Sequence, residues 1–356
     1  MSTGPYVSFV TYGRNDGYTP SYFRRVTRAL ACLANQLEQA GIDAEIVFIE
    51  WNPPANQPLL LDLFKLPRAL QHVSVRGFIV PPEHHREFAG FREAGFHAGE
   101  AANTGIRRAR GRFITPKASD TFLSPQVFGM IAGGTLDADT MYRIDRHDVP
   151  IDDDAIWDLG DTALLARIAS LPSTPHAWIH QSPHWRLREL HTNACGDFTL
   201  MSAAYWHYLR GHPKDHSVLS LDIDSLVLHA ASALGVQERR WPDSCRVYKP
   251  IHGKVFGERV QQIWRPWQRT LDRLLSEKAS DEAAHWMRTT FDYPRRKIRG
   301  VDSVIGPSIE KNFVRLASHW ARGEKPVPTQ PENWGMADVT LEARTLCRAD
   351  WDKADL

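Results

Sequence analysis

The stretch NTGIRRARGRFITPKASDTFLS, residues 103–124, decides the expected fold of this 356-residue chain. Its first part has the apolar spacing of a helix, and Gly111 follows as the glycine that commonly ends one. Residues 113–115 then read as a buried strand, which ends near Pro116 because proline cannot donate a hydrogen bond to a central ladder. Asp120 is therefore expected in a loop at the carboxyl edge of a sheet, where open α/β sheets bind ligands.

Strand and helix patterns alternate before this stretch. Strands are expected at residues 6–11, 44–49 and 73–80, and helices at residues 21–40 and 88–110. A strand, a helix and a second strand within about 45 residues favour a right-handed βαβ unit. The chain is therefore predicted to be an α/β protein with a Rossmann-like, doubly wound mixed sheet.

The second half of the chain is expected to complete this domain and then to become helical. Further elements are expected at residues 141–149, 161–171, 191–201, 219–234 and 246–248. Residues 1–257 are predicted to form the α/β domain, and residues 258–356 a helical C-terminal extension packed on or beside it. The stripe formed by Trp264, Trp267 and Trp286 is typical of a core or of a homodimer contact through these helices.

Composition and charge exclude several classes of protein. Lys+Arg 43 against Asp+Glu 42 gives a formal net charge of +1, so no global field favours nucleic acid or an anionic membrane surface. The four cysteines lie far apart without a CxxC pair, which fits reduced thiols. No charged leader precedes a long apolar run, and no apolar stretch approaches membrane-spanning length. We therefore expect a soluble cytoplasmic protein with no nucleic-acid partner and no transmembrane segment.

Polar side chains follow the first two expected strands. Thr11, Arg14 and Asp16 follow the first strand, and Glu50 and Asn52 follow the second. Because the carboxyl ends of parallel strands meet at one edge of a sheet, these side chains are expected to line one crevice and to contact a ligand there. Ordinary loop polarity is the alternative explanation for each of them taken alone.

Seven short motifs, found in order over residues 6–255, resemble a known family. They are RNDGY, EWNPP, NTGIRRARGRFI, YRIDRHDV, NACGDFTLMS, DIDSL and a final Tyr-x-x-x-His that ends at His252. Together they resemble a group of bacterial glycosyltransferase-like proteins of the GT-A superfamily, relatives of the large family-2 transferases. No single motif carries the resemblance, but EWNPP, YRIDRHDV and CGDFTLMS are specific when found together.

The resemblance implies a fold, an activity and a cofactor. It implies a GT-A catalytic domain over residues 1–257 that moves a sugar from a UDP- or GDP-linked donor to a hydroxyl of a glycan or glycolipid acceptor. The implied enzyme is a hexosyltransferase of polysaccharide biosynthesis. It also implies a divalent cation, Mn²⁺ or Mg²⁺, held by the acidic loop at Asp120 and by the late His252. Such a cation would neutralise the leaving diphosphate.

The sequence departs from the family pattern at two positions that bear on this cation. The acidic loop reads Ala118-Ser119-Asp120, where other GT-A enzymes have Asp-x-Asp, so it supplies one carboxylate. Lys249 stands where a second histidine is expected, and a lysine there can meet a diphosphate directly as a point charge. A turn aspartate and a structural histidine are the alternatives for Asp120 and His252.

Transfer with inversion requires a general base near the acceptor hydroxyl. Asp224 is the first candidate, because it opens the helix expected at residues 219–234, where backbone amides favour an ionised carboxylate. Asp222 and Asp197 are the other candidates, and a helix cap or a turn acid is the structural alternative for each. The remaining expected donor contacts are Asn103, Arg107, Ser119, Arg143 and Lys249.

Two further functions stay open. A sugar nucleotidyltransferase can share the sheet order, but it requires a loop of the GxGTRL type after the first strand, where this chain has GRNDG. A catalytically silent carbohydrate- or nucleotide-binding protein on a GT-A fold is favoured by the missing first acid of the acidic loop and by the altered late motif.

Overall fold

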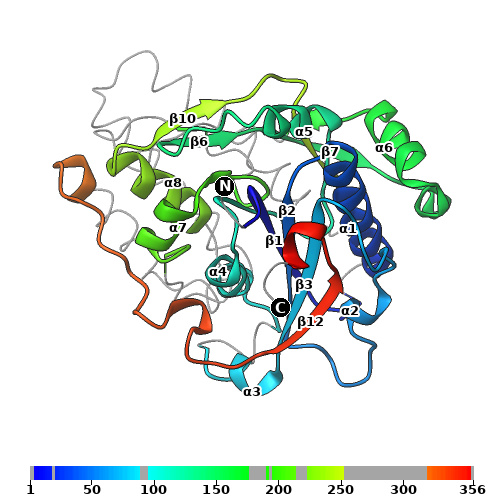
Figure 1. The fold of residues 1–356 in the computed structure, drawn as a ribbon, viewed down its shortest axis with the longest axis horizontal. Helices are drawn as coiled ribbons and strands as arrows, with labels where there is room; N and C mark the ends of the chain where they lie inside the picture. The colour runs from blue at the N-terminus through cyan, green and yellow to red at the C-terminus, as the bar shows by residue number, and fades with distance from the viewer. Residues whose placement is uncertain are drawn as a thin grey trace, which may run out of the picture.

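The protein is a mixed α/β fold built around a six-stranded sheet (Figure 1). The computed structural model describes residues 4–17, 21–88, 95–175, 190–191, 195–213, 223–251 and 319–353. The strand order of the main sheet is β12-β3-β2-β1-β4-β9. The predicted α/β class with a mixed sheet is therefore confirmed.

Four parallel strands form the centre of the main sheet. β1 (Val7–Gly13) pairs with β2 (Ala44–Trp51) on one side and with β4 (Phe113–Pro116) on the other, and β2 pairs with β3 (Val73–Val80). The chain thus builds outward from β1 through β2 and β3 and then returns to the opposite side of β1. This reversal makes the carboxyl ends of β1 and β4 a topological switch point, the place where such sheets bind ligands.

Two helical layers cover the sheet because successive strand side chains point to opposite faces. Phe9 of β1 packs in a core cluster with α1 (Tyr22–Gln39), whereas the next residue, Val10, packs in a second cluster with α4 (Ala98–Arg108) (Figure 1). The approach of α4 is close. A Cβ placed on Gly105 would lie 2.4 Å from Val10 Cγ1, so α4 requires glycine at that position.

A second sheet in the molecule has four strands. Its order is β5 (Phe122–Leu123), β11 (Arg246–Ile251), β7 (Asp145–Pro150) and β8 (Thr174–Pro175), with β11 parallel to β7 and antiparallel to β5. A two-stranded pair joins β10 (Gln237–Arg240) to β6 (Thr140–Arg143), and β9 (Met201–Ser202) pairs with β4. The loop after β4 leads directly into β5, so it connects the two larger sheets.

The remaining helical segments are short. They are α2 (Leu60–Leu63), α3 (Pro82–His85), α5 (Pro125–Ala132), α6 (Asp161–Ser170), α7 (Ala203–Leu209), α8 (Ile223–Ala233), and the 3₁₀ turns η1 (Asp154–Asp158), η4 (Trp334–Met336) and η5 (Asp350–Lys353). α4 begins at Ala98 rather than at residue 88. The Gly95 carbonyl accepts side-chain hydrogen bonds from Arg14 and Asn52 instead of continuing a helix. Among the described helices, none has both the length and the apolar character needed to cross a bilayer.

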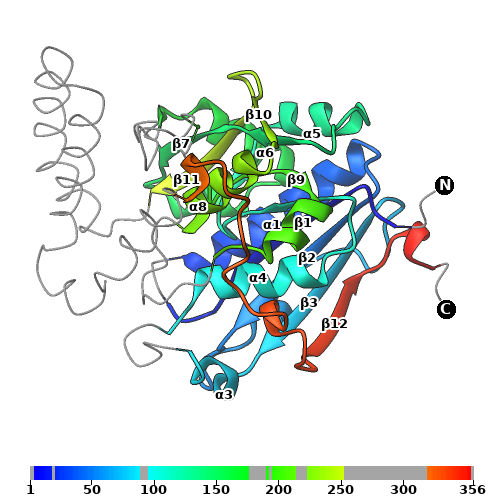
Figure 2. The ribbon, with the colours of Figure 1, turned by 90° about the vertical axis from the view of Figure 1, so that its left-hand side faces the viewer.

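The C-terminal segment differs from its prediction. The sequence predicts a helical extension over residues 258–356, but within the described residues 319–353 the chain forms β12 (Glu342–Cys347), which pairs antiparallel with β3 (Figure 2). The physical reason is that β3 is otherwise an edge strand, and a strand from the same chain satisfies its backbone groups. The predicted domain boundary at residue 257 stays a prediction. The aromatic stripe at Trp264, Trp267 and Trp286 lies outside the described residues.

Candidate active site

Asp120 is the centre of a charged cluster at the switch point. It lies in the loop between β4 and β5 and is only 3% exposed. Lys249 Nζ donates a hydrogen bond to Asp120 Oδ1, and an Arg25 guanidinium nitrogen lies 3.5 Å from Asp120 Oδ2. Both carboxylate oxygens therefore face a cation. The pairing of Phe122 with Tyr248 between β5 and β11 brings Lys249 to this position.

Lys117 adds a third basic side chain to the cluster. It follows β4 directly, is buried, and donates from Nζ to the carbonyl of Ala118 at 2.8 Å. Burial lowers the pKa of Lys117 to about 7, against the opposing charges of Asp120 and Asp197. We call Arg25, Lys117, Asp120 and Lys249 the Asp120 cluster. Sequence reasoning missed Lys117, although a lysine directly after a buried strand and three residues before Asp120 is a usable signal.

Ser119 lies at the edge of this cluster, beside the end of β1. Its hydroxyl is 3.0 Å from the hydroxyl of Tyr22 on α1. A Cβ on Gly13 would lie 2.9 Å from the Tyr22 hydroxyl, so the glycine that ends β1 allows the tyrosine to approach. Burial raises the pKa of Tyr22 and the charge of Asp120 raises it further, which keeps the phenol neutral as a hydrogen-bond donor.

Two of the predicted catalytic carboxylates, Asp197 and Asp224, lie close together. A Cβ on Gly196 would lie 2.7 Å from Asp224 Oδ2, so Asp224 packs against the backbone next to Asp197. Tyr12, near the end of β1, faces both acids. Burial raises the pKa of Tyr12, and the charges of Asp197 and Asp224 raise it further. The structure therefore brings the two acids together beside β1.

The two acids have different partners. Arg146 donates to Asp197 Oδ2 at 2.9 Å and also pairs with Asp148 at 3.0 Å. Asp224 lies in the first turn of α8, as predicted, and its Oδ1 accepts from the backbone N–H of Ser225 at 3.0 Å. Asp197 is thus held by a side-chain cation, whereas Asp224 is held by the start of a helix. The third candidate base, Asp222, lies outside the described residues.

Arg14, Asp16 and Asn52 lie close together after the ends of β1 and β2. Arg14 and Asn52 both donate to the carbonyl of Gly95, and Arg14 lies 3.6 Å from Asp16. Asn52 has a positive φ of 47°, a conformation that asparagine tolerates better than most residues. Thr11 is buried at the end of β1, and its Oγ1 has no hydrogen-bond partner among the described residues.

Four of the predicted donor contacts have partners within the protein. Both oxygens of Glu50 accept backbone N–H groups, from Leu60 at 2.6 Å and Leu61 at 2.9 Å. The amide of Asn103 exchanges two hydrogen bonds with the backbone of His212.

The two arginines of this set are also engaged. Arg107 lies over the ring of Trp334 at 5.2 Å, and the fully buried Arg143 donates to the His191 carbonyl and to Thr199 Oγ1. All four side chains, Glu50, Asn103, Arg107 and Arg143, are thus engaged within the protein, and their contacts with a donor stay a prediction. The sequence shows that they are polar, but not which face the folded chain covers.

The described residues do not fit a divalent cation at Asp120. No group of three His, Cys, Asp or Glu side chains within them is arranged to hold a metal ion. Hard cations bind several oxygen ligands, but both oxygens of Asp120 face Lys249 and Arg25. A cation at this carboxylate would have to displace two positive side chains. The other predicted ligand, His252, lies outside the described residues.

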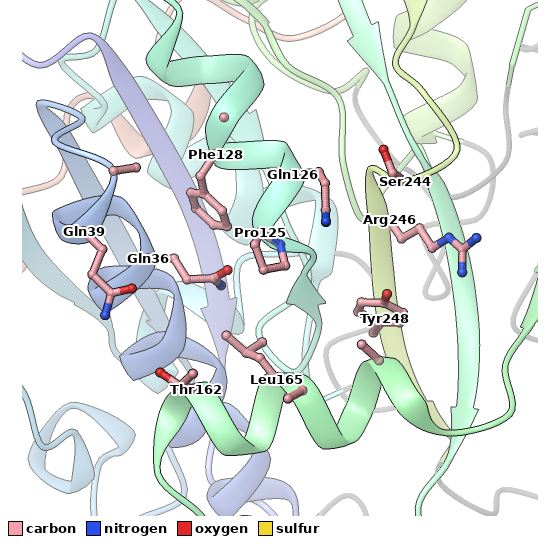
Figure 3. Close-up of a pocket in the computed structure, with 14 residues that line it drawn as sticks. Gln36, Gln39, Pro125, Gln126, Phe128, Thr162, Leu165, Ser244, Arg246 and Tyr248 are labelled. Atoms are coloured by element: carbon pink, nitrogen blue, oxygen red, sulfur yellow. The ribbon is translucent and has the colours of Figure 1, made fainter.

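A separate groove with a volume of about 680 Å³ lies between α1, α5, α6 and β11 (Figure 3). Arg246 is the only charged side chain among the described residues that line it. Arg246 and Tyr248 alternate with Lys249 along β11, so the groove and Lys249 lie on opposite faces of that strand. The described lining of the groove contains no acid and a single cation, so the Asp120 cluster is the stronger candidate for a charged functional site.

The fold and the site together define an α/β protein with a charged cluster at the switch point of its sheet. No protein-family model matches the chain, and no curated protein matches its sequence. Similar solved structures include residues 1–349 of S. aureus TarS in complex with UDP-GlcNAc, with 12% identity, coverage of 90% of this chain and 81% of that chain, and a TM-score of 0.46. Mannosyltransferase PcManGT from Pyrobaculum calidifontis, in complex with GDP-Man and Mn²⁺, has 12% identity, coverage of 92% and 77%, and a TM-score of 0.40. Similarity at this level does not assign a function to this chain.

Proposed function

We propose that this protein is a glycosyltransferase that moves a sugar from a UDP- or GDP-linked donor to a hydroxyl of a glycan or glycolipid acceptor. One observation carries the proposal. The cationic Asp120 cluster and the Asp197–Asp224 pair both lie where β1 and β4 end. The charges of Asp120 and Asp197 both act to raise the pKa of Lys117. The first group suits a diphosphate and the second suits a hydroxyl that must lose a proton.

The proposed reaction is a single displacement at the anomeric carbon. The acceptor oxygen forms a bond to that carbon while the bond from the carbon to the diphosphate oxygen breaks. The bonding electron pair leaves with the diphosphate, and the hydroxyl proton passes to a carboxylate. Fixed positive groups beside the leaving oxygen stabilise the charge that develops there.

Asp224 is the proposed general base and Asp197 a positioning residue. Asp197 is engaged by Arg146, which fixes its orientation and balances its charge. Asp224 packs against Gly196, which has no side chain to cover the carboxylate. A base must contact the acceptor hydroxyl directly, and this arrangement favours Asp224 for that contact.

Donor binding is assigned to side chains at the ends of the parallel strands. Thr11 lies near the end of β1, and Arg14, Asp16, Asn52 and Ser119 follow β1, β2 and β4. These five side chains are proposed to contact the nucleoside. Lys249 is proposed to contact the diphosphate, because its side chain is the most exposed of the Asp120 cluster.

The test is a donor panel. The protein is incubated with UDP- and GDP-linked sugars, and released UDP or GDP is measured. UDP-GlcNAc and GDP-Man are the first donors to try, because the two similar transferases hold them. Release that is selective for one donor and accelerated by a glycan acceptor is the expected result.

Two other outcomes contradict the proposal. Nucleotide binding without any turnover favours the catalytically silent binding protein, which the single carboxylate of the loop and its contact with Lys249 also suit. Absence of both binding and turnover across the panel removes a nucleotide sugar as the ligand.

A further inference from the structure

We infer that fixed side-chain cations, with Lys249 foremost and Arg25 behind it, replace a divalent metal at the donor diphosphate. The inference rests on the proposed function and deepens it, since it names the group that meets the leaving diphosphate. It follows from three features of the Asp120 cluster.

The first feature is access. The side chain of Lys249 is 20% exposed, whereas the side chains of Asp120 and Arg25 are each 5% exposed. An incoming ligand therefore reaches the ammonium of Lys249 before it reaches the carboxylate. A diphosphate gains a charge-assisted contact at that position, while a metal ion meets a like charge.

The second feature is the balance of charge. One carboxylate, Asp120, faces two cations, Lys249 and Arg25, so these three side chains together carry a net positive charge. Two acids of the described part of the chain that lie on this side, Asp197 and Asp148, both pair with Arg146. A nucleoside diphosphate supplies the missing negative charge, and a further dication would add to the excess.

The third feature is geometry. Lys249 lies in β11, directly opposite Asp148 of β7, and β11 also pairs with β5, which begins two residues after Asp120. The backbone of Lys249 is thus fixed between two strands rather than in a loop. A positive group held in this way is preorganised for the charge that develops when the bond between the sugar and the diphosphate breaks and the electron pair moves to the diphosphate.

These features give Asp120 a positioning role that differs from ligation. As a metal ligand, Asp120 would be needed for nucleotide binding. As a counter-charge that holds Lys249 and Arg25, it competes with the diphosphate for the same cations. The two roles predict opposite effects of Asp120→Asn on the affinity for a nucleoside diphosphate.

The experiment measures the binding of UDP and GDP by calorimetry, in excess EDTA and in excess Mn²⁺. We expect wild-type protein to bind one nucleotide in EDTA, with a Kd that Mn²⁺ changes by less than about threefold. Lys249→Met is expected to weaken binding about tenfold or more, and Lys249→Arg to retain most of it. Asp120→Asn is expected to bind in EDTA at least as tightly as wild type.

Each contrary result has its own meaning. Wild-type binding that requires Mn²⁺, or that Asp120→Asn abolishes, overturns the inference and leaves the proposed function intact. Wild-type affinity in Lys249→Met also overturns it. No binding of either nucleotide under both conditions overturns the proposed function and the inference with it. If thermal unfolding shows that Lys249→Met does not fold, the nucleotide affinity of wild-type protein in EDTA and in Mn²⁺ still tests whether a metal is needed.

Discussion

At the scale of single residues, the acids of the site differ in what holds them. Asp120 is held by Lys249 and Arg25, Asp197 by Arg146, and Asp224 by the first turn of α8. An acid that already neutralises a cation is suited to positioning that cation. An acid at a helix start that accepts from the neutral groups Ser225 N–H and the Cys195 thiol is suited to accepting a proton.

Asp224→Asn keeps the size of the side chain and its ability to accept from Ser225 N–H. We expect sugar transfer to fall by about 10² to 10⁴, because a positioned general base typically contributes that factor. Nucleotide affinity should stay within a few-fold of wild type, since the base is not a donor contact. Steady-state transfer assays and calorimetry check both parts, with the exposed Asp338→Asn as the control. Transfer at the wild-type rate would move the role to Asp197 or Asp222.

Glu50 gives a prediction about pH. Burial raises its pKa from 4.5 to about 7, against the lowering effect of the Leu61 and Leu60 amides. The folded state binds the Glu50 proton more tightly than the unfolded state does, so protonated Glu50 adds to the free energy of unfolding. This contribution is fully present below about pH 4.5 and is lost as the pH rises through about 7. The loss is on the order of 3 kcal/mol at about 1.4 kcal/mol per pKa unit.

Glu50→Gln removes the titrating group and should flatten this part of the pH dependence. Urea unfolding at about pH 5 and about pH 8 gives the change in the free energy of unfolding between the two pH values, and this change is compared between wild type and variant. The variant also loses one of the two backbone hydrogen bonds, so only the change in slope with pH tests the argument. Equal slopes for the two proteins would show that Glu50 is ionised throughout this range.

At the scale of elements, the position of α4 against β1 depends on a missing side chain. A Cβ at residue 105 of α4 would lie 2.4 Å from Val10 Cγ1 and 3.3 Å from Ile49 Cγ1. Both neighbours are buried strand residues with no room to move. The same helix carries Asn103, which exchanges two hydrogen bonds with His212, so its placement also fixes the chain after α7.

Gly105→Ala is therefore expected to destabilise the protein by about 1–3 kcal/mol through overpacking. Gly129→Ala, in α5, is the matched control, because nothing lies within 4 Å of a Cβ there. That variant should stabilise by about 0.5–1 kcal/mol, since alanine is the better helix former. Urea denaturation of both variants gives the comparison. Equal effects would mean that the helix shifts away from β1 without cost.

At the scale of the whole molecule, residues 319–353 return to the main sheet and close both its edge and one face. β12 pairs with β3, and η4 lies against α4 (Figure 2). Arg108 anchors this return by donating to the carbonyls of Gly335 at 2.6 Å, Met336 at 2.9 Å and Val339 at 3.2 Å. Residues 319–353 therefore contribute a strand to the main sheet and pack against its helical layer.

Arg108→Met should cost roughly 2 kcal/mol of the free energy of unfolding, because it leaves backbone carbonyls without their charged donor. The neighbouring Arg107→Met removes only a cation–π contact with Trp334 and should cost about 0.5–1 kcal/mol. Urea denaturation ranks the two variants. A cost for Arg107→Met equal to or above that of Arg108→Met would contradict this account of the anchor.

The sequence by itself determined the local elements and the positions of the acids along them. Periodicity identified β1, β2, β3 and β4, because it reports which side chains are buried by their own element. Pro116 and the loop that follows it located Asp120 at a strand end, and the start of α8 located Asp224.

Only the tertiary structure decided which partners these side chains have. Lys249 and Asp120 are 129 positions apart, and no local pattern predicts that the pairing of β11 with β5 brings them together. The covering of Asn103 and Arg107 by residues near 212 and 334, and the return of β12 to β3, are likewise contacts between distant segments. The physical reason is that local propensity and burial are properties of neighbours in sequence, whereas charge pairing depends on the topology that brings distant strands side by side.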